Sequence, residues 1–144
     1  HYFDRLDNKR MALYSGYHYG FAGFNADQEY LGRQYNAVLT YSHDSNLLML
    51  LHGRADISVV TRSYLRLYQS ENPQQSARLL VSERVDQVCH HHALLRPQGP
   101  LDASQLASLL QDLQHSGRLG ELVSRYHLRT AGEAVAEHAD PMPR

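Results

Sequence analysis

Residues 37–63 read AVLTYSHDSNLLMLLHGRADISVVTRS, and this stretch predicts a strand, a helix and a second strand in succession. Asp44 or Ser45 starts the helix, because both residue types are favoured N-caps. Gly53 is well placed to end the helix in the left-handed conformation. Residues 57–60 carry three β-branched apolar side chains, Ile57, Val59 and Val60, that lie on both faces of a strand, which is typical of a parallel sheet covered by helices. The apolar face of the helix consists of Leu47, Leu48, Leu50 and Leu51.

The same alternation continues on both sides of this stretch. Residues 10–15 predict a strand that runs into a turn at Gly16. Residues 27–35 predict a helix, capped by Asn25 or Asp27. Residues 63–71 predict another helix, which Asn72-Pro73 stops because the residue before proline disfavours helix. Alternating strands and helices indicate an α/β fold with a mostly parallel sheet.

The later part of the chain reads differently. Residues 79–82 and 85–95 are candidates for extended structure. Asp102 caps a helix, and Ser116-Gly117 separates it from a second one. From residue 131 onward the chain reads as a tail. Both helices repeat apolar residues at helical spacing: Leu106, Leu109, Leu110 and Leu113 in the first, and Leu119, Leu122, Val123 and Tyr126 in the second.

Composition limits the classes of function. The chain has 144 residues and a net charge of −1, which gives no reason to expect nucleic acid or anionic lipid as a partner. No apolar run approaches the ~20 residues of a membrane helix. The single cysteine, Cys89, excludes an internal disulfide. There is no nucleophile elbow and no phosphate loop, so we expect neither an enzyme nor a bound cofactor.

Cys89-His90-His91-His92 has residue types that bind zinc or copper. In an extended strand, however, His90 and His92 point one way while Cys89 and His91 point the other. A two-ligand half-site completed elsewhere is one interpretation; a strand with partly exposed imidazoles is the other, and no metal site is predicted. Candidates to complete a half-site are His52, His115 and His127.

Four segments, in order, resemble the bacterial extracellular solute-binding proteins of polar amino-acid ABC transporters: residues 51–60, 63–73, 92–97 and 106–128. The resemblance implies a type 2 periplasmic-binding-protein fold with two lobes. Residues 1–85 would form the second lobe, as a three-layer α/β unit. Residues 86–130 would be the C-terminal remnant of the first lobe, and residues 131–144 a tail. It also implies a periplasmic protein that binds a small solute and presents it to a membrane permease.

The resemblance further implies that the N-terminal part of the first lobe is absent from this sequence. The leucine faces of the helix pair at 106–128 would then lack the sheet they cover. Monomers rarely expose large apolar patches. We therefore expect either a missing lobe segment or packing of these helices on another copy of the chain.

Ligands of parallel sheets gather at the carboxyl ends of the strands. After the third strand, the family has an Asp that takes the ligand's ammonium, and Arg62, or Thr61 if the register slips by one, stands there. Arg62 favours an anionic group, or else it is a solvated residue at a helix start. The expected ligand is therefore a small polar or anionic solute. The candidate ligand-binding residues are Ser15, Gly16 and Tyr17 after the first strand, Tyr41 and His43 after the second, and Thr61 and Arg62 after the third.

Three details of these candidates remain open. Ser15-Gly16-Tyr17 stands where the family has a hydroxyl-bearing turn that opens toward the ligand. Tyr17 would supply a stacking face there, and Tyr14 and Tyr19 are close in sequence, but strand alternation keeps all three from lining one pocket. Asp44 beside His43 reads as a helix cap. A sensory or regulatory domain, or an interaction domain that has lost its ligand, would fit the same resemblance.

Overall fold

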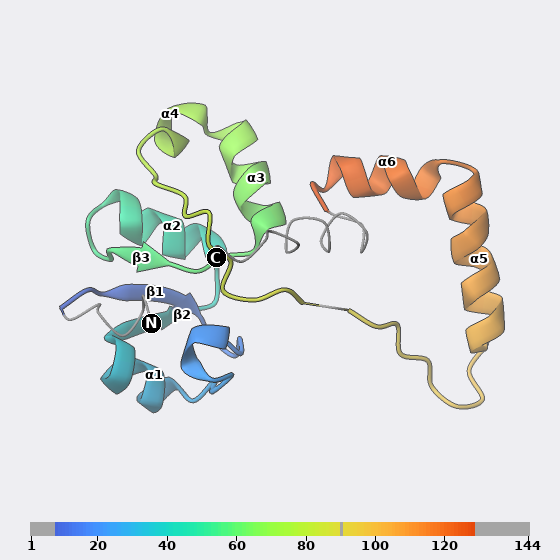
Figure 1. Cartoon of the computed structure of the whole chain (residues 1–144), viewed down its shortest axis with the longest axis horizontal. Helices are drawn as coiled ribbons and strands as arrows, with labels where there is room; N and C mark the ends of the chain where they lie inside the picture. The colour runs from blue at the N-terminus through green and yellow to red at the C-terminus, as the bar shows by residue number, and fades with distance from the viewer. Residues whose placement is uncertain (1–7, 90, 129–144) are drawn as a thin grey trace, which may run out of the picture. The chain divides into compact units, whose positions relative to one another are not determined.

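The computed structural model describes residues 8–89 and 91–128, which form two compact units that divide between Gln87 and Val88 (Figure 1). The sequence predicts a boundary between residues 85 and 86. The assignment of the two units to lobes stays a prediction. The tail predicted from residue 131 lies outside the described residues.

The first unit contains a three-stranded parallel sheet in the order β2-β1-β3. The strands are β1 (Met11–Tyr14), β2 (Ala37–Thr40) and β3 (Ile57–Ser58), with Met11 opposite both Ala37 and Ile57. The central strand is the most buried element, because Met11, Ala12 and Leu13 have no exposed surface. The predicted α/β character with a parallel sheet is therefore confirmed.

The described residues 8–87 of this unit contain four helices: α1 (Gln28–Tyr35), α2 (His43–Leu51), α3 (Arg62–Glu71) and α4 (Pro73–Ser76). A short 3-10 turn, η2 (Gly20–Ala22), precedes them. The chain crosses from β1 to β2 through α1 and then back past β1 to β3 through α2 (Figure 1). Since both crossovers are right-handed by rule and run in opposite directions, the two helices cover opposite faces of the sheet.

Side-chain alternation along the strands supports this arrangement. Met11 and Leu13 pack with Leu31 of α1 and with Tyr19 and Ala22 of the η2 loop. Tyr14 has the other parity, and its ring contacts His43 of α2.

Local signals fix the ends of α1 and α2. Asp27 caps α1, and its side chain accepts a 2.7 Å hydrogen bond from the Tyr30 amide. Gly53 adopts the predicted left-handed conformation after α2, with φ of 68°. The predicted cap of α2 is wrong: the backbone leaves the extended region at Ser42, whose side chain accepts from the Ser45 amide. Asp44 and Ser45 already lie in the first turn.

Several extended segments differ from the expectation. β3 has two residues instead of four and is half-buried, because it pairs only with β1 at the edge of the sheet. No strand forms in residues 79–82, nor in the described residues of 85–95. Leu80 and Leu94 are almost fully exposed there, so no neighbouring strand or core stabilises an extended pairing. Leu48 of α2 is also exposed, unlike Leu47.

The second unit contains α5 (Ala103–His115) and α6 (Arg118–Arg125), as predicted. Asp102 and Gln105 form a reciprocal capping box at the start of α5. Gly117, with φ of 78°, ends the connection and begins α6. The two helices contact each other, yet neither contains a buried residue. The apolar side chains Leu109, Leu110, Leu122 and Tyr126 are all exposed.

The core of the first unit can be tested with two leucines. Leu31→Ala removes a side chain that is 1% exposed, so we expect a loss of about 2–5 kcal/mol in the free energy of unfolding. Leu48→Ala is the matched control, because Leu48 is 46% exposed, and should cost far less. Urea unfolding followed by circular dichroism measures both. Equal losses would contradict the position of the core.

Candidate functional site

The candidate site lies at the carboxyl edge of the parallel sheet, by which we mean the side where the strands end and not an outermost strand. Because β1, β2 and β3 run in the same direction, their carboxyl ends all meet at this edge. Helices α2 and α3 begin at the same edge. All the candidate residues follow these strand ends: Ser15, Gly16 and Tyr17 after β1, Tyr41 and His43 after β2, and Thr61 and Arg62 after β3.

Four aromatic side chains, Tyr14, Tyr17, His43 and Tyr64, form what we call the ring cluster. The Tyr14 ring centroid lies 4.7 Å from that of Tyr17 and 5.0 Å from that of His43. His43 lies 5.7 Å from Tyr17, edge to face, and 4.9 Å from Tyr64. These distances are typical of favourable aromatic pairs. The cluster thus joins the ends of β1 and β2 to the first turn of α3.

His43 is the central residue of the ring cluster. Its Nδ1 atom is buried and has no hydrogen-bond partner among residues 8–89 and 91–128. Burial lowers the pKa of His43, and the nearby Asp44 carboxylate opposes the shift to a smaller extent. The position of His43 at the start of α2 also disfavours a positive charge, because a helix N-terminus is itself positive. The imidazole is therefore neutral at pH 7.

Asp44 and Tyr64 connect the first turns of α2 and α3. The Tyr64 hydroxyl donates a 2.5 Å hydrogen bond to Asp44 Oδ1. Burial, and then this hydrogen bond, raise the pKa of Tyr64. Asp44 is therefore not the helix cap that the sequence predicts. Its carboxylate instead holds the phenol of α3 against the start of α2.

Tyr19 fixes the loop that follows β1. Its hydroxyl accepts a 2.8 Å hydrogen bond from the Tyr14 amide and donates to the Tyr14 carbonyl at 3.2 Å. Burial raises the pKa of Tyr19 to about 12. Tyr14 and Tyr17 do touch, whereas Tyr19 is buried in the core cluster. The expectation that the three tyrosines do not line one surface is consistent with this arrangement.

The remaining candidates have different surroundings. Ser15 Oγ accepts a 2.6 Å hydrogen bond from Gln28 Nε2 at the start of α1. Gly16 has φ of 83°, which explains a glycine at the turn. Tyr41 is exposed, and the described ring contacts that form the cluster do not include it. Thr61 precedes α3 without capping it through its side chain.

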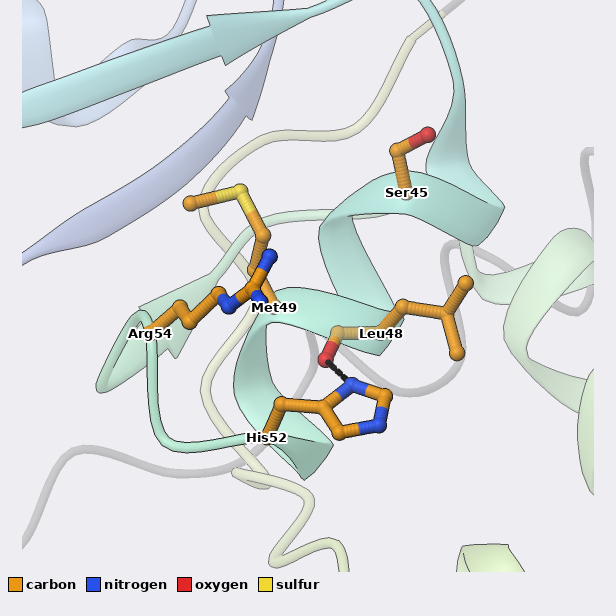
Figure 2. A pocket seen from close by; sticks show the side chains of 5 residues that line it. All are labelled: Ser45, Leu48, Met49, His52 and Arg54. Atoms are coloured by element: carbon orange, nitrogen blue, oxygen red, sulfur yellow. Dashed lines mark hydrogen bonds between the residues drawn. The ribbon is translucent and has the colours of Figure 1, made fainter.

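A shallow hollow on the outer side of α2 is a separate feature (Figure 2). It is lined by Ser45, Leu48, Met49, His52 and Arg54, and none of the candidate residues reaches it. The His52 Nδ1 atom donates to the Leu48 carbonyl at 2.8 Å within the same helix. The hollow is open to solvent and has few polar groups that converge, so it is a weaker candidate than the sheet edge.

A metal site and a membrane-spanning helix are two further features that the sequence raised. Among residues 8–89 and 91–128, no three side chains of His, Cys, Asp or Glu converge as a metal site requires. His90 lies outside the described residues, and so does part of the half-site interpretation of Cys89-His90-His91-His92. In the same described part of the chain, no helix is long and apolar enough to cross a membrane.

Comparisons with known proteins give no family for this chain. No protein-family model, no curated protein and no solved structure matches it. The site must therefore be interpreted from its own geometry.

Sequence reasoning missed Tyr64 and the role of Asp44. A usable signal exists in hindsight: Tyr64 is the third residue of α3, and the first turn of a helix that follows a parallel strand lies at the carboxyl edge of the sheet. The contact with His43 depends on how α2 and α3 are placed by the sheet, which the sequence pattern does not specify.

His43 gives a test of the ring cluster. Its imidazole should titrate below pH 6.5 in the folded protein, because burial favours the neutral form. The folded state then binds fewer protons than the unfolded state. The stability that His43 contributes should be complete above pH 6.5 and decrease as the pH falls toward the folded pKa. His43→Phe should reduce this pH dependence.

NMR titration of the imidazole protons and urea unfolding at several pH values measure these two effects. Titration of His43 at or above pH 6.5 would contradict its burial in the cluster.

Proposed function

We propose that the carboxyl edge of the sheet binds a small polar or anionic solute. The observation that carries the proposal is the convergence of all three strand ends, together with direct contact between Tyr17 of the first loop and His43 of the second. Open α/β sheets bind ligands at this edge because loops and helix N-termini meet there. The ring cluster would supply an apolar contact face.

The preference for an anionic group rests on the start of α3. Arg62 is its first residue and is exposed, and the side chain of Thr61 does not cap the helix. Backbone amides at a helix N-terminus and a guanidinium group both favour an anion. Ser63 and Tyr64 follow directly, so an anion there would lie beside the ring cluster.

The finer assignment follows from the resemblance alone. We infer a type 2 periplasmic-binding-protein fold that acts as the solute-binding component of an ABC uptake system, without catalytic activity. A periplasmic location and a permease partner are parts of the same proposal. Helices α5 and α6 would then belong to the other lobe, and their exposed leucines support the need for a covering surface.

A ligand-sensing or ligand-free interaction domain of the same fold is the second candidate. One observation favours loss of the ligand: the rings of the cluster pack on each other, and Asp44 already accepts from Tyr64. Such a self-satisfied surface offers fewer groups to a solute than an open cleft would.

Arg62→Asp tests the charge preference of the edge. If the guanidinium binds an anionic group, the affinity of the variant for organic acids should fall by about tenfold or more. This is the loss expected for a hydrogen bond to a charged group. The variant should also gain relative affinity for amines. A thermal-shift screen of organic acids, amino acids and amines, followed by calorimetry, measures the change.

Arg66→Asp is the matched control. Arg66 is exposed and lies one turn later in α3, and its substitution introduces the same charge change. Equal effects of both variants would indicate a general electrostatic effect. If no solute binds the wild-type chain in the screen, the interaction-domain alternative is favoured.

The exposed faces of α5 and α6 give a separate prediction. Uncovered leucines should make the chain self-associate or bind a hydrophobic dye such as ANS, because water-exposed apolar surface is unfavourable. Leu109→Glu combined with Leu122→Glu should reduce both effects, whereas Leu80→Glu, an exposed leucine of the first unit, should not. Sedimentation and dye fluorescence measure this. A wild-type monomer that binds no dye would contradict the prediction.

A further inference from the structure

Asp86 makes an unusual pair of contacts for a residue in an otherwise exposed segment. Its Oδ2 accepts a 2.9 Å hydrogen bond from the Gly20 amide, and its Oδ1 accepts a 2.8 Å bond from the Phe21 amide. Residues 80–85 are exposed, while Asp86 and Gln87 are half-buried. The carboxylate therefore caps the first amides of η2 from a position 65 residues later in the chain.

Two neighbouring contacts strengthen this attachment. Gln87 Nε2 donates a 2.6 Å hydrogen bond to the His18 carbonyl. A side chain at Gly20 would place its Cβ 2.8 Å from the Asp86 carbonyl oxygen, closer than real contacts allow. Gly20 thus permits the close approach of the two segments. Residues 18–21 are held by the last two residues of the first unit.

The held loop leads directly to the ring cluster. Tyr19 directly precedes Gly20 and Phe21 in the chain, and its hydroxyl bonds to the backbone of Tyr14 at the end of β1. The Tyr17 ring lies 6.2 Å from that of Tyr19 and 5.7 Å from that of His43. A shift of residues 19–21 would therefore move Tyr17 relative to His43.

We propose that Asp86 is a positioning residue, which sets the place of Tyr17 in the ring cluster by holding the η2 loop at the point where the chain leaves the first unit. The carboxylate bonds to the amides of Gly20 and Phe21, which are not candidate ligand-binding residues, and so acts through residues 19–21. Its effect on solute affinity rests on the proposed function, but its effect on ring geometry does not. A change in the direction in which the chain leaves the unit would reach the candidate site by this route.

Asp86→Asn in the full 144-residue chain tests the proposal. An amide oxygen can accept from one backbone N–H, but the amide nitrogen would face the second, so the double cap is lost. The matched control is Asp56→Asn. Asp56 Oδ2 accepts a 2.9 Å hydrogen bond from the Arg10 amide. Arg10 directly precedes β1, so this bond lies at the end of the sheet where the strands begin, away from the carboxyl edge.

The readout is the NMR shift of the His43 imidazole protons and the Tyr17 ring protons, which sense one another through ring currents. We expect Asp86→Asn to shift both sets of signals, and Asp56→Asn to leave them at their wild-type positions. Gln87→Met, which removes only the bond to His18, should shift them in the same direction by less. It keeps the proposal testable if Asp86→Asn does not fold.

Unchanged His43 and Tyr17 signals in a folded Asp86→Asn variant would overturn the proposal. Equal shifts in the Asp56 control would do the same, because they would indicate general loosening. Any solute found for the wild-type chain should bind Asp86→Asn more weakly than Asp56→Asn, because Tyr17 would be displaced from its place in the ring cluster. Shifted signals without a solute would refute the proposed function and leave the positioning role standing.

Discussion

The parallel pairing of β1 with β2 on one side and β3 on the other is the constraint on which the first unit depends. It buries Met11, Ala12 and Leu13 completely and brings three strand ends to one edge. The two crossovers then leave in opposite directions, which puts α1 and α2 on opposite faces. Every contact in the ring cluster follows from that geometry, because the cluster joins the loops at the edge.

The sheet is small, and this affects how the site is held together. β3 contributes only two residues, and Val38 of β2 is exposed. Apolar packing by the core therefore holds few of the residues at the carboxyl edge. Specific polar contacts replace extended packing there. Tyr64 bonds to Asp44 across two helices, and Asp86 caps the η2 loop from the far end of the unit. Bonds to charged groups are stronger than neutral ones, which suits this role.

The second unit shows helices that local chemistry defines without tertiary burial. The Asp102–Gln105 capping box and the left-handed Gly117 fix where α5 and α6 start. The apolar stripes at helical spacing are present, but Leu109 and Leu122 stay exposed. A helix can therefore be predicted from its own sequence even where its packing partner cannot.

The sequence by itself determined the strand–helix alternation from β1 to α3, the parallel sheet, the helix pair α5 and α6, and the cap at Asp102. It limited the cap of α1 to Asn25 or Asp27. These depend on periodicity and on hydrogen bonds within a few residues. Only the tertiary structure decided that Asp44 pairs with Tyr64, that residues 79–82 remain unpaired, and that Asp86 holds Gly20 and Phe21. The physical reason is that each of these outcomes depends on a partner 20 or more residues away, or on its absence, and no local pattern encodes such a partner.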